Sequence, residues 1–250
     1  MIGRVAALLL AILIPGQAVA CPEPIQGLLF HSCWSGGQAE ASILLLPEDD
    51  PAKLTGNGIL VTGAYTSREK RKDGRTKPVG LFMRDGEVIN RNLGRMDGIL
   101  IIDPSRGEPA IYHRQQVPAG EEVYDLTMLD QRSEFIRHAS ARNFSVMQSH
   151  LLIIDGKPDV TPREDAPEYR RRLLFTDAYG FGIWQSPAPA TLHKAALQIV
   201  EQLSPVMAIN LDMGSYDFCE RISDGIRVNC SLVPGIDTKK LSNMLFLSTR

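Results

Sequence analysis

The sequence predicts an α+β fold: one domain in which mixed or antiparallel sheet hairpins pack with a few helices. Three observations predict it. Short β-branched apolar segments are separated by Gly- and Asp-rich turns, two stretches have helical periodicity, and the strands follow one another instead of alternating with helices. With 250 residues, 44% of them hydrophobic, the chain can build a sizeable core, and it has no evident linker, repeat or low-complexity tract.

The first 20 residues predict a secretory signal peptide. Arg4 precedes an apolar run, and the small residues Ala18, Val19 and Ala20 form a cleavage site before Cys21. The run is short and is interrupted at Pro15, so we expect no transmembrane segment in the mature protein. The predicted mature domain is therefore 21–250.

The first half of the mature chain predicts strands and hairpins. Residues 41–46 form an apolar run ending in an acidic turn, and 57–67 are β-branched between glycines. Residues 78–90 surround the hairpin dipeptide Asp85-Gly86, and 98–113 repeat the strand–turn–strand pattern.

Residues 68–77, REKRKDGRTK, are the most charged segment of the chain. They predict a solvated loop. A basic flap over an anionic ligand is the functional alternative.

The second half predicts two helices and three further strand segments. Residues 121–140 keep apolar side chains near one helical face, and Thr191 caps a helix that runs to Leu203. Residues 144–160 predict a strand that ends in an Asp-Gly turn, and 170–186 predict a hairpin around Asp177-Gly180. The last strand ends at Asn210-Leu211.

Four cysteines allow three connectivities. We favour the local pairs Cys21–Cys33 and Cys219–Cys230, which suit an oxidising compartment and predict a periplasmic or secreted protein. A lipoprotein, acylated at Cys21, is the alternative, and it would leave Cys33 unpaired. The sequence contains no close cluster of Cys and His residues, so we expect no zinc site.

The formal net charge of −2 gives no basic excess for nucleic acid, so we expect no such partner. We expect no cofactor. The Asp-rich turns would tolerate a divalent cation, but none has the spacing of a dedicated calcium loop. The oligomeric state is left open.

Asp212 directly follows the apolar strand end Ala208–Leu211. It is either a polar turn residue, which could also cap a helix, or a carboxylate held at the rim of a site. Loops positioned by a sheet are common places for catalytic groups.

Between residues 57 and 222 the order of segments resembles the phosphodiester glycosidase family, which includes the uncovering enzyme of the mannose 6-phosphate pathway and bacterial relatives associated with exopolysaccharides. Thr62 stands where the family has Asn, and Tyr65 where it has an aromatic residue or Met. The following segment is similar to the family's P-x-G-L hairpin. The stretch from Gln148 to Gly156 resembles its Q-S-G-P-x-L-x-x-x-G motif, with His150 in place of Gly.

Two further segments carry the resemblance. Among Arg170, Arg171 and Arg172, which stand in the place of the family's Arg, we select Arg172. The stretch INLDMGS is similar to N-L-D-G-G-G-S, with Met213 in place of Gly.

The resemblance implies a secreted hydrolase of a glycosidic or sugar-1-phosphodiester bond. It also implies that Asp212 and Arg172 lie in one pocket. Arg172 would hold the phosphate, and Asp212 would stabilise charge at the anomeric carbon or activate water. Asp155 and Asp177 are reserve carboxylates that also fit turns. The implied substrate-binding residues are Thr62, Gln148, Ser149, His150, Gly214 and Ser215.

Two alternatives stay open. The chain could be a non-catalytic carbohydrate-binding or envelope-assembly protein that keeps the fold, because Thr62, His150 and Met213 depart from the family pattern. It could also be an unrelated α+β domain, in which case Arg172 and Asp212 would lie far apart.

Overall fold

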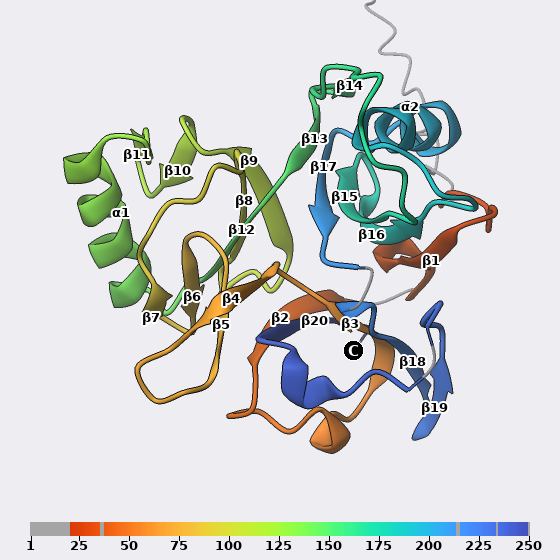
Figure 1. The fold of residues 1–250 in the computed structure, drawn as a ribbon, viewed down its shortest axis with the longest axis horizontal. Coiled ribbons are helices and arrows are strands. Elements are labelled where there is room, and N and C mark those ends of the chain that lie inside the picture. Colours follow the sequence, from red (N-terminus) through yellow and green to blue (C-terminus); the bar gives the residue numbers. More distant parts are fainter. Residues whose placement is uncertain (1–20, 36–37, 214–215, 234, 250) are drawn as a thin grey trace, which may run out of the picture.

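The computed structural model describes residues 21–35, 38–213, 216–233 and 235–249. In these residues the protein is mainly β, with five antiparallel sheets and two α-helices (Figure 1). The α+β prediction was therefore wrong. Many segments that carry no clear alternation in the sequence form strands of three to five residues, and pairing across the sheets holds them in place.

The first large sheet contains β17, the strand that Asp212 directly follows. Its strand order is β1-β16-β15-β17-β13-β14, and α2 packs on one face through Ala195, Ala196 and Ile199. The elements are β1 Leu28–His31, β13 Leu151–Ile154, β14 Lys157–Pro158, β15 Arg172–Asp177, β16 Gly180–Gln185, α2 Leu192–Leu203 and β17 Met207–Leu211.

The second sheet has the order β7-β6-β12-β8-β9, and α1 packs against it with the small β10–β11 hairpin. Phe135 and Ala139 are the residues of α1 that are buried there. The elements are β6 Phe82–Arg84, β7 Glu87–Asn90, β8 Gly98–Ile102, β9 Pro109–His113, β10 Val117–Ala119, β11 Glu122–Tyr124, α1 Leu129–Ala141 and β12 Ser145–Ser149.

The third sheet joins the two ends of the chain in the order β19-β18-β3-β20-β2. A separate hairpin, β4–β5, leaves it near the end of β3. The elements are β2 Ala39–Leu45, β3 Asn57–Thr62, β4 Thr66–Lys70, β5 Thr76–Pro78, β18 Cys219–Ser223, β19 Ile226–Asn229 and β20 Asn243–Thr249, with short 3-10 helices η1 Ser32–Ser35, η2 Pro51–Lys53 and η4 Thr238–Lys240.

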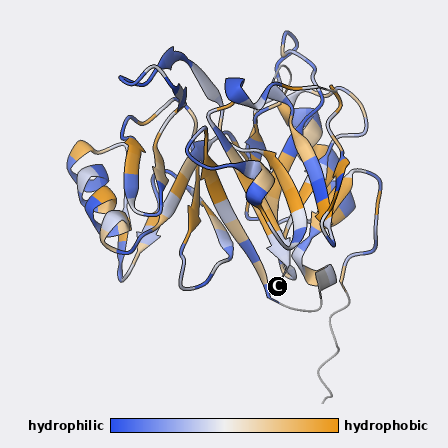
Figure 2. Cartoon of the chain, turned by 90° about the horizontal axis from the view of Figure 1, so that it is seen from below, coloured by the Kyte–Doolittle hydropathy of each residue, from blue (hydrophilic) through white to orange (hydrophobic). Residues whose placement is uncertain are grey.

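One apolar cluster joins the three large sheets. It contains Val61 of β3, Leu100 of β8 and Leu174 of β15, together with residues of β2, β12, β17 and β20. Figure 2 shows the apolar colouring concentrated on the strands inside the molecule and hydrophilic colouring on the loops. Burial of these strand faces is the main stabilising contribution to the arrangement.

Several predicted elements are confirmed. Asp85 and Gly86, with φ of 48° and 82°, form the turn between β6 and β7, since both positions of such a tight hairpin require positive φ. The hairpins around Pro104–Gly107 and Asp177–Gly180 also form. Thr191 caps α2 by accepting a hydrogen bond from Lys194 N at 3.1 Å.

Three predicted elements differ. The helix expected over 121–140 begins only at Leu129, because residues 122–124 pair as β11. The single strand expected from 144 is two strands, since β12 and β13 separate at His150 and enter different sheets. Residues 68–77, expected to be a loop, lie largely in the β4–β5 hairpin.

The two local disulfides form, Cys21–Cys33 and Cys219–Cys230. Among the described residues, no helix is long and apolar enough to cross a membrane. The predicted signal peptide lies outside the described residues.

Candidate functional site

A cavity of about 350 Å³ opens where β17 ends. Three segments meet there: the turn after β3, the segment before β15, and the end of β17. Its lining residues are Tyr65, Tyr169, Arg170, Arg171, Asn210, Leu211, Asp212 and Met213.

Sheet register explains why these residues converge. β15 and β17 are antiparallel neighbours, with Arg172 opposite Leu211 and Leu173 opposite Asn210. Arg171 directly precedes β15 and Asp212 directly follows β17, so both lie at the same end of this antiparallel strand pair. Since side chains alternate between the two faces of a strand, Arg171 and Arg172 point to opposite sides, and Arg171 is the one that lines the cavity.

Asp212 is held at the end of β17 with only 5% of its surface exposed. Its backbone N donates to Gly63 O at 2.9 Å, and its Oδ2 accepts from Thr66 N at 3.2 Å. Burial raises the pKa of Asp212 to about 7, although the N–H groups of Thr66 and Met213 favour the ionised form. Asp212 is thus a strand-end residue whose carboxyl group faces a cavity. This group can exchange a proton near neutral pH.

Tyr65 and Asn210 form the polar wall beside Asp212. Asn210 Nδ2 donates to Tyr65 Oη and, at 2.9 Å, to Leu211 O. Burial, and next the charge of Asp212, raises the pKa of Tyr65 to about 12, so the phenol stays protonated. Because Tyr65 Oη accepts from Asn210, its own proton is available to a bound molecule.

Asn210 Oδ1 is buried and has no hydrogen-bond partner among the described residues. The residue itself is only 2% exposed and lines the cavity. A buried amide oxygen left unpaired costs free energy, which a hydroxyl donor from a ligand would offset.

Two arginines line the cavity: Arg170, whose Nη1 donates to Ser186 O at 3.0 Å, and Arg171. Arg171 Nε donates to Ala190 O and its Nη2 to Pro167 O, both at 3.0 Å, which fixes the guanidinium. The group also lies over the ring of Tyr169, 5.2 Å from the ring centroid. A fixed cation in the lining of the cavity suits a ligand that carries an anionic group.

Arg172, the residue selected from the sequence, lies elsewhere. Its side chain is fully buried and pairs with Asp217 at 2.8 Å, while Nη1 donates to Phe218 O and Nη2 to Gln185 Oε1. Asp217 in turn accepts from Leu232 N. Arg172 therefore joins β15 to the segment before β18, and it does not line the cavity with Asp212.

His150 lies next to the cavity but not in its lining. Its ring meets that of Tyr65 edge to face at 5.7 Å, and its backbone O accepts from Asn210 N. Burial lowers the pKa of His150, with Asp97 opposing this shift and Arg171 adding to it. A neutral imidazole at pH 7 follows, positioned to support the Tyr65 ring.

Three more predicted binding residues are used inside the fold. Thr62 Oγ1 donates to Tyr216 O and accepts from Phe218 N. Gln148 Oε1 accepts from the N–H groups of Leu81 and Gly94, its Nε2 donates to two carbonyls, and Ser149 Oγ donates to Asn210 O. These three side chains position the strands around the cavity and do not line it.

The remaining candidates lie in turns or outside the described residues. Asp155 sits at φ 48° in a turn with Gly156, and Asp177 is paired with His31 at 3.0 Å. Gly214 and Ser215 lie outside the described residues. Within the described residues, no group of three or more His, Cys, Asp or Glu side chains could hold a metal ion.

Sequence reasoning missed Arg171 and Asn210 as site residues, and it gave Tyr65 no role. Strand parity was the available signal. Asn210 lies two residues before Asp212 and therefore points to the same side of the chain, and Arg171 lies on the opposite side of its chain from Arg172.

No protein-family model matches this sequence, and no curated protein matches it. Among solved structures, the chain is similar to an exported protein from Burkholderia pseudomallei, with a TM-score of 0.52 and 12% identity, over 84% of this chain and 71% of that one. This likeness concerns the fold alone.

Two other structures align less well. The catalytic domain of zebrafish N-acetylglucosamine-1-phosphodiester alpha-N-acetylglucosaminidase, auto-inhibited by its pro-peptide, gives a TM-score of 0.49 at 13% identity, over 84% of this chain and 73% of that one. A hypothetical protein from Synechocystis gives 0.47 at 14%, over 88% of this chain and 58% of that one. Scores below 0.5 support no argument about this chain.

Proposed function

We propose that the protein is an exported hydrolase of a glycosidic or sugar-1-phosphodiester bond, with its site in the cavity at the end of β17. The observation that carries the proposal is the buried Asp212 carboxyl, whose pKa is about 7 and which faces a cavity that the fixed guanidinium of Arg171 also lines. Functional sites are where buried groups with such shifted pKa values concentrate.

The chemistry follows from the lining residues. Asp212 accepts a proton from water as the oxygen bonds to the anomeric carbon, and the bond from that carbon to the phosphate oxygen breaks, releasing a phosphomonoester. Arg171 binds the phosphate, and the Tyr65 hydroxyl donates to an oxygen of the substrate. Asn210 Oδ1 accepts from a sugar hydroxyl.

Asp212 is the one carboxylate among the lining residues that the structure describes. Glycosidases acting on a neutral leaving group ordinarily use two. A phosphate leaving group departs without protonation by a second acid, so the lining favours a phosphodiester over a simple glycoside.

Export is supported by the two disulfides and by the fold shared with an exported protein. Together with the predicted signal peptide, they favour a periplasmic or secreted location.

A non-catalytic carbohydrate-binding protein is the second candidate. Tyr169, with 57% of its surface exposed at the rim of the cavity, favours it, because an exposed aromatic face is a good stacking surface for a sugar ring. This reading predicts ligand binding without turnover.

The test is hydrolysis of a panel of sugar-1-phosphodiesters by the mature, oxidised domain and its Asp212→Asn variant. Asp155→Asn is the matched control, since it makes the same chemical change in a turn where Asn tolerates the positive φ. We expect turnover in the parent and the control, and a loss of at least about a hundredfold in Asp212→Asn. Sugar binding without turnover in the parent would establish the second candidate instead.

A further inference from the structure

The β4–β5 hairpin and η4 carry five exposed cations: Arg68, Lys70, Lys72, Lys239 and Lys240. We call these residues the cationic face. None of the five has a carboxylate within ion-pair distance in the described part of the chain. Residues 66–78 have a net charge of +4 in a chain whose formal net charge is −2, so the positive charge is concentrated here.

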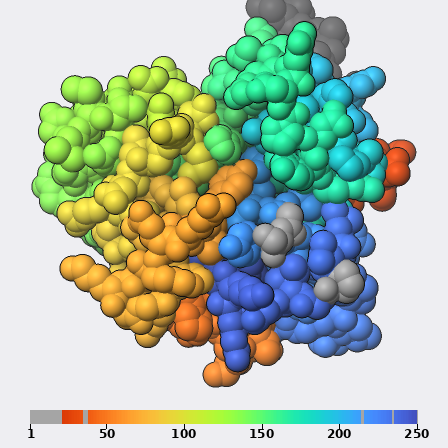
Figure 3. All heavy atoms as spheres, in the orientation of Figure 1, coloured from red at the N-terminus to blue at the C-terminus, as the bar shows by residue number. Residues whose placement is uncertain are grey.

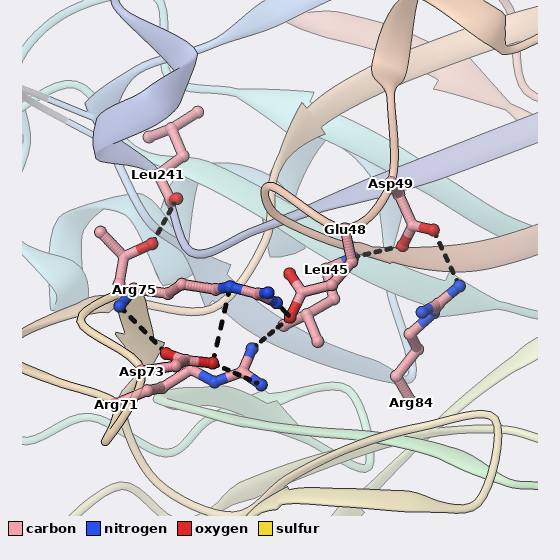
Figure 4. Close-up of polar contacts among 9 residues, drawn as sticks. Leu45, Glu48, Asp49, Arg71, Asp73, Arg75, Arg84 and Leu241 are labelled. Atoms are coloured by element: carbon pink, nitrogen blue, oxygen red, sulfur yellow. Dashed lines mark hydrogen bonds and ion pairs between the residues drawn. The ribbon is translucent and has the colours of Figure 1, made fainter.

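The hairpin is fixed to the body of the protein by its other cations. Arg71 and Arg75 both bind Glu48 Oε1, at 2.6 and 2.5 Å, and both lie 3.5 Å from Asp73 Oδ2 (Figure 4). These two guanidiniums are neutralised. The cations left unpaired are those that the fold presents to solvent.

Strand pairing brings the two parts of the cationic face together. Lys70 lies opposite Thr76, so both side chains leave the same face of the hairpin. Thr76 Oγ1 donates to Leu241 O at 2.8 Å, directly after Lys239 and Lys240. Figure 3 shows the hairpin, in orange, bordering the deep blue C-terminal segment on one surface of the molecule.

β4, the strand that carries Arg68 and Lys70, begins at the candidate site. Thr66, the first residue of β4, donates its N–H to Asp212 Oδ2 and follows Tyr65 in the sequence. From Thr66 to Lys70 a strand extends about 13 Å. A ligand that reaches from the cavity to Lys70 must therefore be extended.

We propose that the cationic face binds an anionic polysaccharide, so that the cavity acts on a bond within or at the end of a charged sugar polymer. This substrate class rests on the proposed function. Positive potential along the path to a site concentrates such a polymer and orients it. Residues 66–78 present no exposed large hydrophobic side chain, which membrane-surface binding would favour.

The test compares binding of polygalacturonate, with one carboxylate per sugar, and neutral dextran of matched length at 20 and 150 mM NaCl. The variant is Lys70→Gln/Lys239→Gln/Lys240→Gln. The control, Arg95→Gln/Lys157→Gln/Arg221→Gln, removes three exposed cations outside the cationic face and gives the same net charge.

We expect the parent to bind polygalacturonate but not dextran, more weakly at high salt. The first variant should bind about tenfold more weakly at low salt, the size expected for three exposed charge contacts, and the control less than twofold. Equal losses in both variants, or no binding by the parent, would overturn the proposal. Equal or stronger binding to vesicles of anionic lipid, lost in the same variant, would identify a membrane surface and overturn it as well.

Turnover of a small sugar-1-phosphodiester is measured on the same variants. We expect it to be unchanged, because none of the substituted residues lines the cavity. Polymer binding without any turnover would reject the proposed function and leave the cationic face standing. Turnover without polymer binding would support the proposed function and reject the cationic face as a polysaccharide-binding surface.

Discussion

At the scale of single residues, the state of Asp212 links stability to pH. Its pKa is about 7 in the folded protein, and an unfolded Asp titrates near 4. Between these values the folded state keeps a proton that the unfolded state releases, so this group lowers the stability as the pH rises from 4 to 7.

Asp212→Asn should remove the loss of folding stability that the Asp212 carboxyl group causes as the pH rises. The shift of about three pKa units corresponds to up to about 4 kcal/mol at pH 8, and to little difference at pH 4. Urea unfolding of parent and variant at pH 4 and 8 measures this. Parallel stability profiles for the two proteins would mean that the carboxyl group is not desolvated in the folded state.

Tyr65→Phe tests the phenol alone, because the ring that contacts His150 is kept. We expect kcat/KM to fall about a hundredfold, the contribution of a positioned hydrogen-bond donor. The free energy of unfolding should change by about 1 kcal/mol, for the lost hydrogen bond with Asn210. A change in stability with full activity would assign the hydroxyl a structural role only.

The sequence singled out Asp212, since a carboxylate directly after an apolar strand is visible in one dimension, and in the structure this residue lines a cavity. The sequence was not sufficient to determine which of the three consecutive arginines line the same cavity. A shift of one residue moves a side chain to the other face of the sheet, and the register of β15 against β17 is a tertiary property.

At the scale of elements, the ion pair of Arg172 and Asp217 connects two sheets. The two side chains are 0% and 1% exposed, and Arg172 also holds Phe218 O and Gln185 Oε1. Arg172 is thus a positioning residue for the chain that leads from Asp212 to β18.

Arg172→Met should destabilise the protein by about 3–5 kcal/mol, because it leaves a buried carboxylate without its partner. The double variant Arg172→Met/Asp217→Leu should recover most of that loss, since no charge remains buried. Urea unfolding of both single variants and the double variant forms the cycle. Additive losses would show that the two side chains do not interact.

The break between β12 and β13 could not be predicted, because the sequence does not show which sheet each strand joins. Residues 145–154 are almost all apolar or small and predict one strand, yet β12 pairs with β6 and β8 while β13 pairs with β14 and β17. His150 lies at the crossing. Hairpins close in the sequence were predictable from their turns, whereas a strand changing sheets depends on partners far along the chain.

At the scale of the whole molecule, the disulfides close two loops of nearly equal length, with sequence separations of 12 and 11. Chain entropy alone gives each about 3 kcal/mol. Cys219 is fully buried, whereas Cys21 is exposed, so their removal should differ.

We expect Cys219→Ala/Cys230→Ala to destabilise the protein more than Cys21→Ala/Cys33→Ala, because only the first pair also leaves a cavity in the core. The free energies of unfolding in urea, measured under identical conditions, decide this. Equal losses would mean that the entropy of the unfolded chain accounts for both bonds.

The predicted fold class was wrong, whereas the predicted hairpins were confirmed, because the prediction relied on local turn signals. Local turns specify which strands are adjacent in the sequence, but they do not specify three sheets around one core. The short strands β4, β5, β10 and β11 have no alternating pattern, and residues 122–124 fit a helical period as well as they fit a strand.

The third sheet has a kinetic consequence. β3 is formed early in the chain, but its two neighbours are β18 and β20, and Asn57 pairs with Thr249. The pairing of β3 with β20 joins residues as far as 192 positions apart in the sequence. Contacts so distant in sequence make folding slow, so this sheet closes late in folding.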